Sequence, residues 1–228
     1  MLLVLNLKMN LSKNEILKYE NAIHDKEVIV LPQFPYIPFF RSGKYLLGSQ
    51  DVSKYSKGAY TGEVCAKGLR DLNCSYVLVG HSERKINFNE TINDSRMKIQ
   101  NVIDNDMIPI YCVNQTEEEL TTDKELKNIE NQLEAIPNYI KYIVVAFEPV
   151  WLIGHKEEVN IRYIERVLKK IKEYLMERNI NHSIIYGGGI RKDNIDYLLE
   201  MQCNNGFIIS SAALDEEELN YIYNQINK

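Results

Sequence analysis

A single carboxylate closes a strongly apolar run in the second half of the chain. Residues 144–147 are apolar and two of them are β-branched, and Glu148 and Pro149 follow them directly. The run predicts a buried strand, which should stop at Pro149 because proline has no N–H to donate to a neighbouring strand. Glu148 is therefore expected at the carboxyl end of a strand, where barrels and open α/β sheets place catalytic groups. It is a candidate general base, and the alternative is a surface carboxylate that merely ends a strand.

The segment behind this carboxylate has the composition of a hinged loop. Val150 and Trp151 follow the proline, and Gly154 comes three residues later. A loop anchored by a tryptophan and hinged at a glycine could close over Glu148 and expel water from it. This makes a purely superficial carboxylate the weaker interpretation.

Two cationic or titratable side chains follow other predicted strands. Lys8 lies just after the first strand, and His81 follows Gly80 after another buried run. A lysine at a strand end is usually solvated, and a lone histidine is usually a satisfied core residue. In the functional interpretation, the ammonium receives an anion and the imidazole polarises a carbonyl. Ser82 and Glu83 should open a short helix whose N–H groups would lower the imidazole pKa.

Two loops near the carboxyl terminus could hold a phosphate. Gly187, Gly188 and Gly189 follow one predicted strand, and Ser210 and Ser211 follow the last one. Glycines allow backbone N–H groups to approach an anion closely, and barrels often bind phosphate at the loops after their seventh and eighth strands. A simple turn is the alternative for either loop.

Alternating strands and helices are expected to position these residues. Such alternation indicates parallel strands joined by right-handed crossovers, so the sequence predicts an α/β fold. The predicted architecture is a single (β/α)8 barrel with parallel strands over residues 1–228. An open doubly wound sheet is the alternative. Only residues 34–42 give a weak helix signal. Strands are expected at 2–7, 27–31, 45–50, 76–80, 108–113, 142–148, 183–187 and 206–210, and helices at 12–24, 63–72, 90–104, 117–135, 160–178, 193–201 and 216–226.

Composition narrows the classes of function. The chain has 228 residues, 45% of them hydrophobic, and a formal charge of −5, without a basic stripe, so nucleic acid is a poor candidate partner. The four cysteines and four histidines show no metal-binding spacing, which predicts reduced thiols, no metal and a cytoplasmic location. The apolar residues 1–5 form too short a run for a signal peptide or a membrane span, so no membrane partner is expected.

Five segments resemble, in order, the signatures of the triosephosphate isomerase family over nearly the whole chain. They are residues 6–10, 58–63, 80–84, 148–154 and 186–188. The resemblance implies a cofactor-free glycolytic and gluconeogenic isomerase of a small phosphorylated sugar, dihydroxyacetone phosphate or D-glyceraldehyde 3-phosphate.

The resemblance also implies roles for individual residues. Glu148 would move the proton between two carbons, neutral His81 would polarise the carbonyl, and Lys8 would offset developing negative charge. Asn6 would position Lys8, and Glu83 would support the site beside His81. The remaining roles are a lid from Pro149 through Val150 and Trp151 to about Val159, a phosphate contact from the Gly154 N–H, a latch at Tyr186, and a homodimer contact at Thr61.

Several departures from the family pattern fall around the phosphate loops. Gly189 replaces a serine, Ser210 and Ser211 replace a glycine pair, and residues 155–159 of the lid are unusual. Ser210 and Ser211 could supply the hydroxyl donors that Gly189 lacks. Asn114 and Gln115 replace a Gly-Glu pair after the fifth strand, where we expect altered packing.

Two alternatives stay open at this point. The altered phosphate loops suggest a related isomerase for a longer phosphosugar, such as a tetrulose phosphate. A barrel retained as a non-catalytic binding protein is less favoured, because the trio Lys8, His81 and Glu148 is intact.

Overall fold

Eight parallel strands close into a barrel in the computed structural model, which describes residues 1–22, 27–40, 45–120, 125–152 and 160–228. The strands pair in sequence order, and β1 pairs with both β2 and β8, so the sheet has no open edge. The predicted barrel is confirmed and the open sheet is wrong. The strands are β1 Leu2–Asn6, β2 Val28–Leu31, β3 Leu46–Ser49, β4 Tyr76–Val79, β5 Ile108–Gln115, β6 Tyr142–Pro149, β7 Asn181–Tyr186 and β8 Gly206–Ile209.

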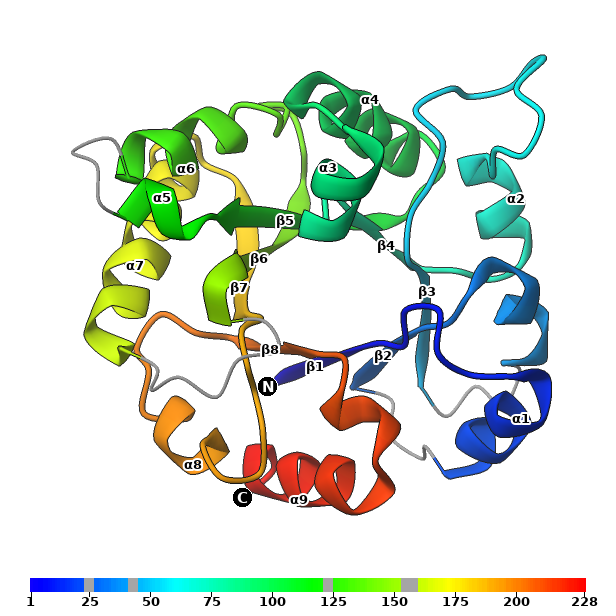
Figure 1. The fold of residues 1–228 in the computed structure, drawn as a ribbon. Helices are drawn as coiled ribbons and strands as arrows, with labels where there is room; N and C mark the ends of the chain where they lie inside the picture. Colours follow the sequence, from blue (N-terminus) through cyan, green and yellow to red (C-terminus); the bar gives the residue numbers. More distant parts are fainter. Residues whose placement is uncertain (23–26, 41–44, 121–124, 153–159) are drawn as a thin grey trace.

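Helices surround the ring of strands (Figure 1). They are α1 Lys13–Ala22, α2 Ala66–Asp71, α3 Ser82–Phe88, α4 Ile92–Ile103, α5 Glu117–Leu120, α6 Glu125–Leu133, α7 Ile161–Glu177, α8 Ile195–Leu198 and α9 Glu216–Ile226, with 3-10 turns η1 Phe34–Phe39, η2 Val150–Leu152 and η3 Ala212–Leu214. Within the described ranges, no helix is both long and apolar enough to cross a membrane.

The helix predictions hold in position but not always in length. The helix expected at 63–72 begins only at Ala66, and the one expected at 193–201 is the single turn α8. The weak signal at 34–42 corresponds to η1, whose proline inside the turn cannot donate a helical hydrogen bond. The predicted short helix after His81 is confirmed as α3.

Alternate residues of each strand enter two separate apolar layers. Val145 and Phe147 of β6 belong to the outer layer between strands and helices, whereas Val144 and Ala146 belong to an inner cluster drawn from seven of the strands. Successive strand residues point to opposite faces, so Glu148 continues the inward-facing series of Val144 and Ala146. The strand period therefore delivers this carboxylate to the inside of the barrel, at its carboxyl end.

Candidate active site

His81 and Glu148 meet at the mouth of the barrel. His81 is the N-cap of α3, and its Nδ1 accepts a hydrogen bond from the backbone N–H of Glu83 at 3.2 Å. Its Nε2 lies 3.1 Å from Oε1 of Glu148. Because Nδ1 is an acceptor, the proton of a neutral ring resides on Nε2 and is donated to the carboxylate. The turn into α3 thus fixes both the orientation and the tautomer of the imidazole.

Opposing influences set the proton affinity of the pair. Burial lowers the pKa of His81, but the carboxylates of Glu148 and Glu83 raise it and prevail, so this pKa lies above its ordinary value and not below it, as the sequence had suggested. Burial raises the pKa of Glu148. The His81 ring, the Ser82 N–H and the Lys8 ammonium lower it by more than burial raises it, so this pKa lies below its ordinary value. Glu148 is therefore ionised at neutral pH.

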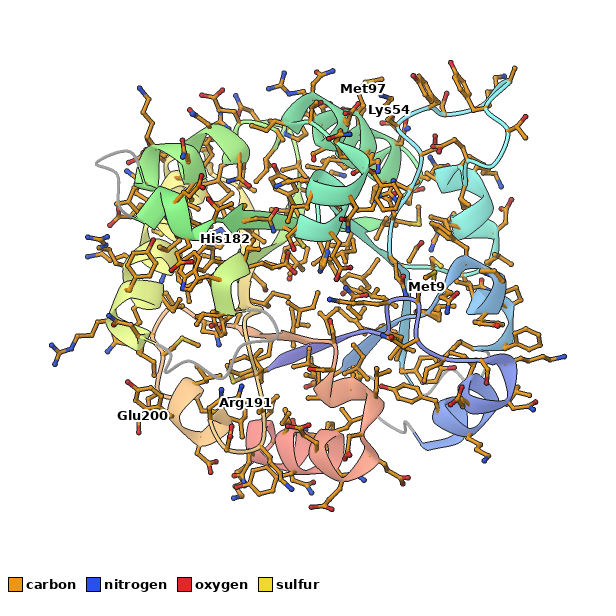
Figure 2. All side chains as sticks on the ribbon, in the orientation of Figure 1. Met9, Lys54, Met97, His182, Arg191 and Glu200 are labelled. Carbon is orange, nitrogen blue, oxygen red and sulfur yellow. The ribbon has the colours of Figure 1, made fainter. Side chains whose placement is uncertain are left out.

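Lys8 occupies a constrained position beside this pair. Its backbone has a φ of +48°, in the left-handed region that costs a non-glycine residue about 1 kcal/mol or more. Asn6 accepts from the Lys8 N–H at 3.2 Å, and Gln50 donates to the Lys8 carbonyl at 2.8 Å, which holds this conformation. The Lys8 ammonium contacts Oε1 of Glu83 at 2.5 Å. Met9, labelled beside the turn after β1 in Figure 2, is 85% exposed.

The three predicted catalytic side chains and the two predicted phosphate loops line one cavity. Its volume is about 310 Å³, enough for a small phosphorylated metabolite. The cavity joins an ammonium, an imidazole and a carboxylate to loops rich in backbone N–H groups. Its lining residues are Lys8, Asn10, His81, Glu148, Gly187, Gly188, Gly189, Ile190, Ile208, Ile209, Ser210, Ser211 and Leu214.

Backbone geometry explains two of the glycines. Gly189 has a φ of +57°, which disfavours any side chain there, including the serine of the family pattern. A Cβ on Gly188 would lie 2.6 Å from the Tyr186 hydroxyl and 2.8 Å from Cγ of Pro149, so only glycine fits. Ser210 and Ser211 have no positive φ, and their side chains therefore cause no such backbone strain.

The structure describes the first hinge of the predicted lid, residues 149–152. Pro149 ends β6, while Val150 and Trp151 form η2, and the Trp151 ring lies 6.2 Å from that of Tyr163. Gly154, the predicted phosphate contact, and residues 153–159 lie outside the described residues. Tyr186, the predicted latch, is fully buried at the end of β7, and its hydroxyl has no hydrogen-bond partner in the described ranges.

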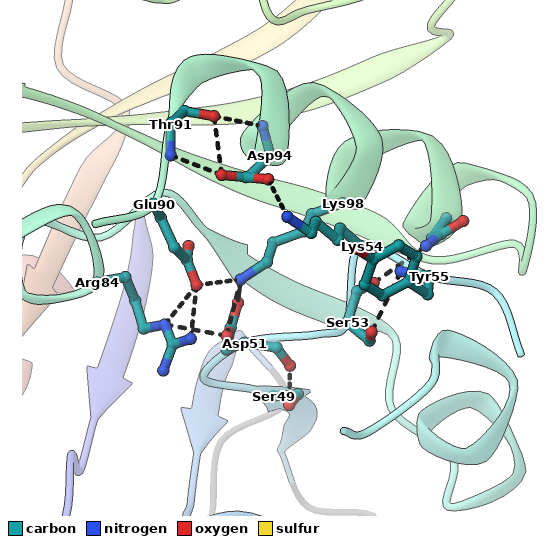
Figure 3. A network of polar contacts seen from close by, with 11 residues as sticks. Ser49, Asp51, Ser53, Lys54, Tyr55, Arg84, Glu90, Thr91, Asp94 and Lys98 are labelled. Atoms are coloured by element: carbon teal, nitrogen blue, oxygen red, sulfur yellow. Dashed lines mark hydrogen bonds and ion pairs between the residues drawn. The ribbon is translucent and has the colours of Figure 1, made fainter. Parts of the chain in front are cut away.

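A largely buried ionic network links α3 to α4 and to the segment after β3 (Figure 3). Lys98 of α4 contacts both oxygens of Asp51 at 2.7 and 2.9 Å and also pairs with Glu90. Arg84 of α3 bonds Glu90 at 2.6 Å and Asp51 at 3.1 Å. Figure 3 also shows the capping box in which Thr91 and Asp94 start α4. The network ties the segment after β3 to the helix that His81 begins.

Thr61 lies apart from the cavity. It is exposed in the segment between β3 and α2, which projects from the edge of the ring in Figure 1. The rings of Tyr55 and Tyr60 stack at 3.7 Å with an interplanar angle of 2°, which stiffens this projection.

Sequence reasoning missed three polar residues that contact the site. Asn10 lines the cavity, Gln50 holds the Lys8 carbonyl, and Asn114 donates from Nδ2 to Oε2 of Glu148 at 2.7 Å. Asn10 belongs to the segment 6–10 that resembles a family signature. Asn114 departs from the family pattern after the fifth strand. Gln50 gave no signal because its contact depends on how β3 and β1 lie in the barrel.

The fold and the cavity define a (β/α)8-barrel protein with acid–base groups at the carboxyl ends of its strands. A family model described as triosephosphate isomerase matches residues 1–226, and the chain belongs to that family. It is 37% identical over 192 residues to the triosephosphate isomerase of Mesomycoplasma hyorhinis, covering 82% of this chain and 76% of that protein. It is 33% identical over 232 residues to the one of Ureaplasma parvum, covering 96% and 97%. The enzyme of Legionella pneumophila strain Paris is 35% identical over 213 residues, covering 88% and 86%.

Proposed function

We propose that the protein interconverts dihydroxyacetone phosphate and D-glyceraldehyde 3-phosphate. The observation that carries the proposal is the convergence of Lys8, His81 and Glu148 in one cavity whose other wall consists of the loops after β7 and β8. Membership of the triosephosphate isomerase family and the similarity to triosephosphate isomerases of other organisms support the same activity.

The chemistry needs one base, one hydrogen-bond donor and one cation. Glu148 takes the proton from the carbon beside the carbonyl, and the resulting enediolate oxygen accepts a hydrogen bond from Nε2 of His81. His81 then moves a proton between the two oxygens, and Glu148 returns its proton to the neighbouring carbon. Lys8 offsets the negative charge that develops on the oxygens. The proton is already acidified by the carbonyl, so the scheme requires no cofactor.

A neutral His81 in the substrate complex is consistent with its surroundings. The carboxylate of Glu148 is the main cause that raises its pKa, and a substrate placed between the two side chains removes that cause. Burial and the Glu83 N–H on Nδ1 remain and oppose a second proton on the ring, and burial outweighs the raising effect of the Glu83 carboxylate. The imidazole then acts as a hydrogen-bond donor of low acidity.

The remaining site residues bind phosphate and control closure in this proposal. Gly187, Gly188 and Gly189 with Ser210 and Ser211 receive the phosphate, aided by the N–H of Gly154. Pro149, Val150 and Trp151 form the lid hinge, and Tyr186 latches the closed lid. Asn6 supports Lys8 through its N–H, and Glu83 orients both Lys8 and His81.

Steady-state kinetics on matched C3 and C4 substrates tests the activity. The proposal expects the highest kcat/KM with D-glyceraldehyde 3-phosphate, and a higher value with a tetrulose phosphate would favour the related isomerase. Binding of either sugar phosphate without turnover would instead indicate a non-catalytic barrel.

A cytoplasmic homodimer built around Thr61 completes the proposal. Several large apolar side chains are exposed in the segments that follow β1, β3 and β4. They include Met9, Tyr60, Ile86, Phe88 and Ile92. A partner subunit would cover such groups and brace the Lys8 segment. Light scattering after size exclusion should give a dimer for the wild type and a poorly active monomer for Thr61→Arg. A fully active monomer would contradict this assembly.

A further inference from the structure

Asn114 is the neighbour of Glu148 across two paired strands. The two residues are register partners in the parallel pairing of β5 with β6. Ile110 and Cys112 belong to the inner cluster, so Asn114 continues their inward-facing series just as Glu148 does on β6. Both side chains therefore face the barrel interior at the same height.

The contact between them is direct and buried. Asn114 is 6% exposed and Glu148 is 3% exposed. Nδ2 of Asn114 donates to Oε2 of Glu148 at 2.7 Å, and the Ser82 N–H lies 3.4 Å from the same oxygen. The reversed amide orientation would place two acceptors against each other, so the donor orientation is the physically reasonable one. Oε1 is left for His81.

A clamp on its backbone fixes Asn114. The side-chain amide of Gln132 accepts from the Asn114 N–H at 3.0 Å and donates to its carbonyl at 2.7 Å. Lys85 also donates to Gln132 at 2.8 Å. Oδ1 of Asn114 has no hydrogen-bond partner among the described residues, so the buried amide is oriented by Glu148 alone. Such an incompletely satisfied buried amide costs stability, and a positioning role for Glu148 would explain why it is present.

We propose that Asn114 is a positioning residue for the base, holding one oxygen of Glu148 so that the other faces His81 and the reacting carbons. This rests on the proposed function only for the identity of the reaction. A donor on a carboxylate also favours its charged form, so losing Asn114 should make Glu148 easier to protonate. The other groups around this carboxylate are His81, Lys8 and the thiol of Cys112, whose pKa is raised by burial and by Glu148.

Two variants and one control test the proposal. Asn114→Ala removes the donor but keeps the backbone clamp, and Asn114→Asp keeps the size while facing a carboxylate with a carboxylate. Tyr142→Phe is the control, because it removes a hydrogen bond to Ser183 of 2.7 Å between β6 and β7, at the amino end of β6 and away from the site. Each is assayed for kcat, KM and the pH profile of kcat/KM.

Both Asn114 variants should lower kcat about tenfold or more, the size of one lost hydrogen bond to a charged group, with little change in KM. Their acid limb should move to higher pH, further for Asn114→Asp, while Tyr142→Phe keeps the wild-type profile. An unchanged acid limb in both Asn114 variants would overturn the proposal, as would an equal effect of the control.

A second readout does not depend on turnover. The Glu148 carboxyl is titrated by carbon-13 NMR of glutamate-labelled protein and assigned by its loss in Glu148→Gln. Its midpoint should rise in both Asn114 variants, and an unshifted midpoint contradicts the role of Asn114 even if the wild type is inactive. An inactive wild type with a shifted midpoint would reject the isomerase function and leave the positioning contact standing.

Discussion

The ring of His81 lies in direct contact with Glu148, with 3.1 Å between Nε2 and Oε1. The proposed reaction needs these two groups on different atoms of the substrate, the carboxylate at carbon and the imidazole at oxygen. Substrate entry must therefore separate the pair. Binding then replaces a strong internal contact with two contacts to the substrate, and it changes the proton affinities of both groups.

This pair should give the free energy of unfolding a specific pH dependence. The lowered pKa of Glu148 stabilises the fold above its unfolded value, and that stabilisation is lost as the pH falls through the folded value. The raised pKa of His81 stabilises the fold below its unfolded value, and that stabilisation is lost as the pH rises through the folded value. The pair therefore contributes most at mildly acidic pH.

Urea unfolding of the wild type and Glu148→Gln across the acidic to mildly alkaline range measures this contribution. The stability difference between them should peak at mildly acidic pH and shrink on both sides. A difference that does not vary with pH would show that the two side chains are not coupled in the folded protein.

Lys98 should be essential to stability rather than to chemistry. Lys98→Met leaves the buried carboxylates of Asp51 and Glu90 without this cation, which should lower the free energy of unfolding by about 3–5 kcal/mol. Burial already raises the pKa of Asp51 even beside Lys98. Lys67→Met, which removes an exposed pair with Asp71, is the control and should change little. Equal effects of the two changes in urea unfolding would contradict the importance of the network.

The sequence predicted all eight strands because each is a short, buried and apolar run, and parallel pairing follows from the helices between them. It also located Lys8, His81 and Glu148, because each follows such a run directly. The lengths of α2 and α8 were overestimated, since amphipathic patterns continue beyond the residues that satisfy helical hydrogen bonds.

The contact of Asn114 with Glu148 could not be predicted from local sequence. It depends on the register of β5 against β6 and on both residues sharing the inward face. Altered packing was expected at Asn114, and the structure instead shows a hydrogen bond to the candidate base. The absence of a positive φ at Ser210 and Ser211 could not be predicted either, because the sequence does not determine φ at a single position.

Ser210 and Ser211 should contribute to phosphate affinity through their hydroxyl groups. Both line the cavity beside Gly189, which has no side chain to donate. The double change Ser210→Gly and Ser211→Gly should weaken inhibition by inorganic phosphate about tenfold or more, the value of a hydrogen bond to a charged group. Ser183→Ala, at the amino half of β7, is the control. An inhibition constant equal to that of the wild type would show that the hydroxyls do not replace the missing donor.

Tyr186 should separate lid function from stability. Its hydroxyl is buried without a partner in the described part of the chain, so Tyr186→Phe should not lower the melting temperature. If the hydroxyl latches the closed lid, kcat/KM should fall about fivefold, as for one ordinary hydrogen bond. Tyr111→Phe is the comparison, since that hydroxyl donates to the Gln132 carbonyl at 2.8 Å and should affect stability. Unchanged kcat/KM in Tyr186→Phe would exclude the latch.

The most direct test of the central claim is the isomerisation of D-glyceraldehyde 3-phosphate by the wild type and by Glu148→Gln in a coupled assay. Glutamine keeps the shape of the side chain and its capacity to bond His81, but it cannot take a proton from carbon. The account predicts an active wild type and a kcat lower by about 10²–10⁴-fold in the variant. Equal rates for the two proteins would contradict the role of Glu148 as the base.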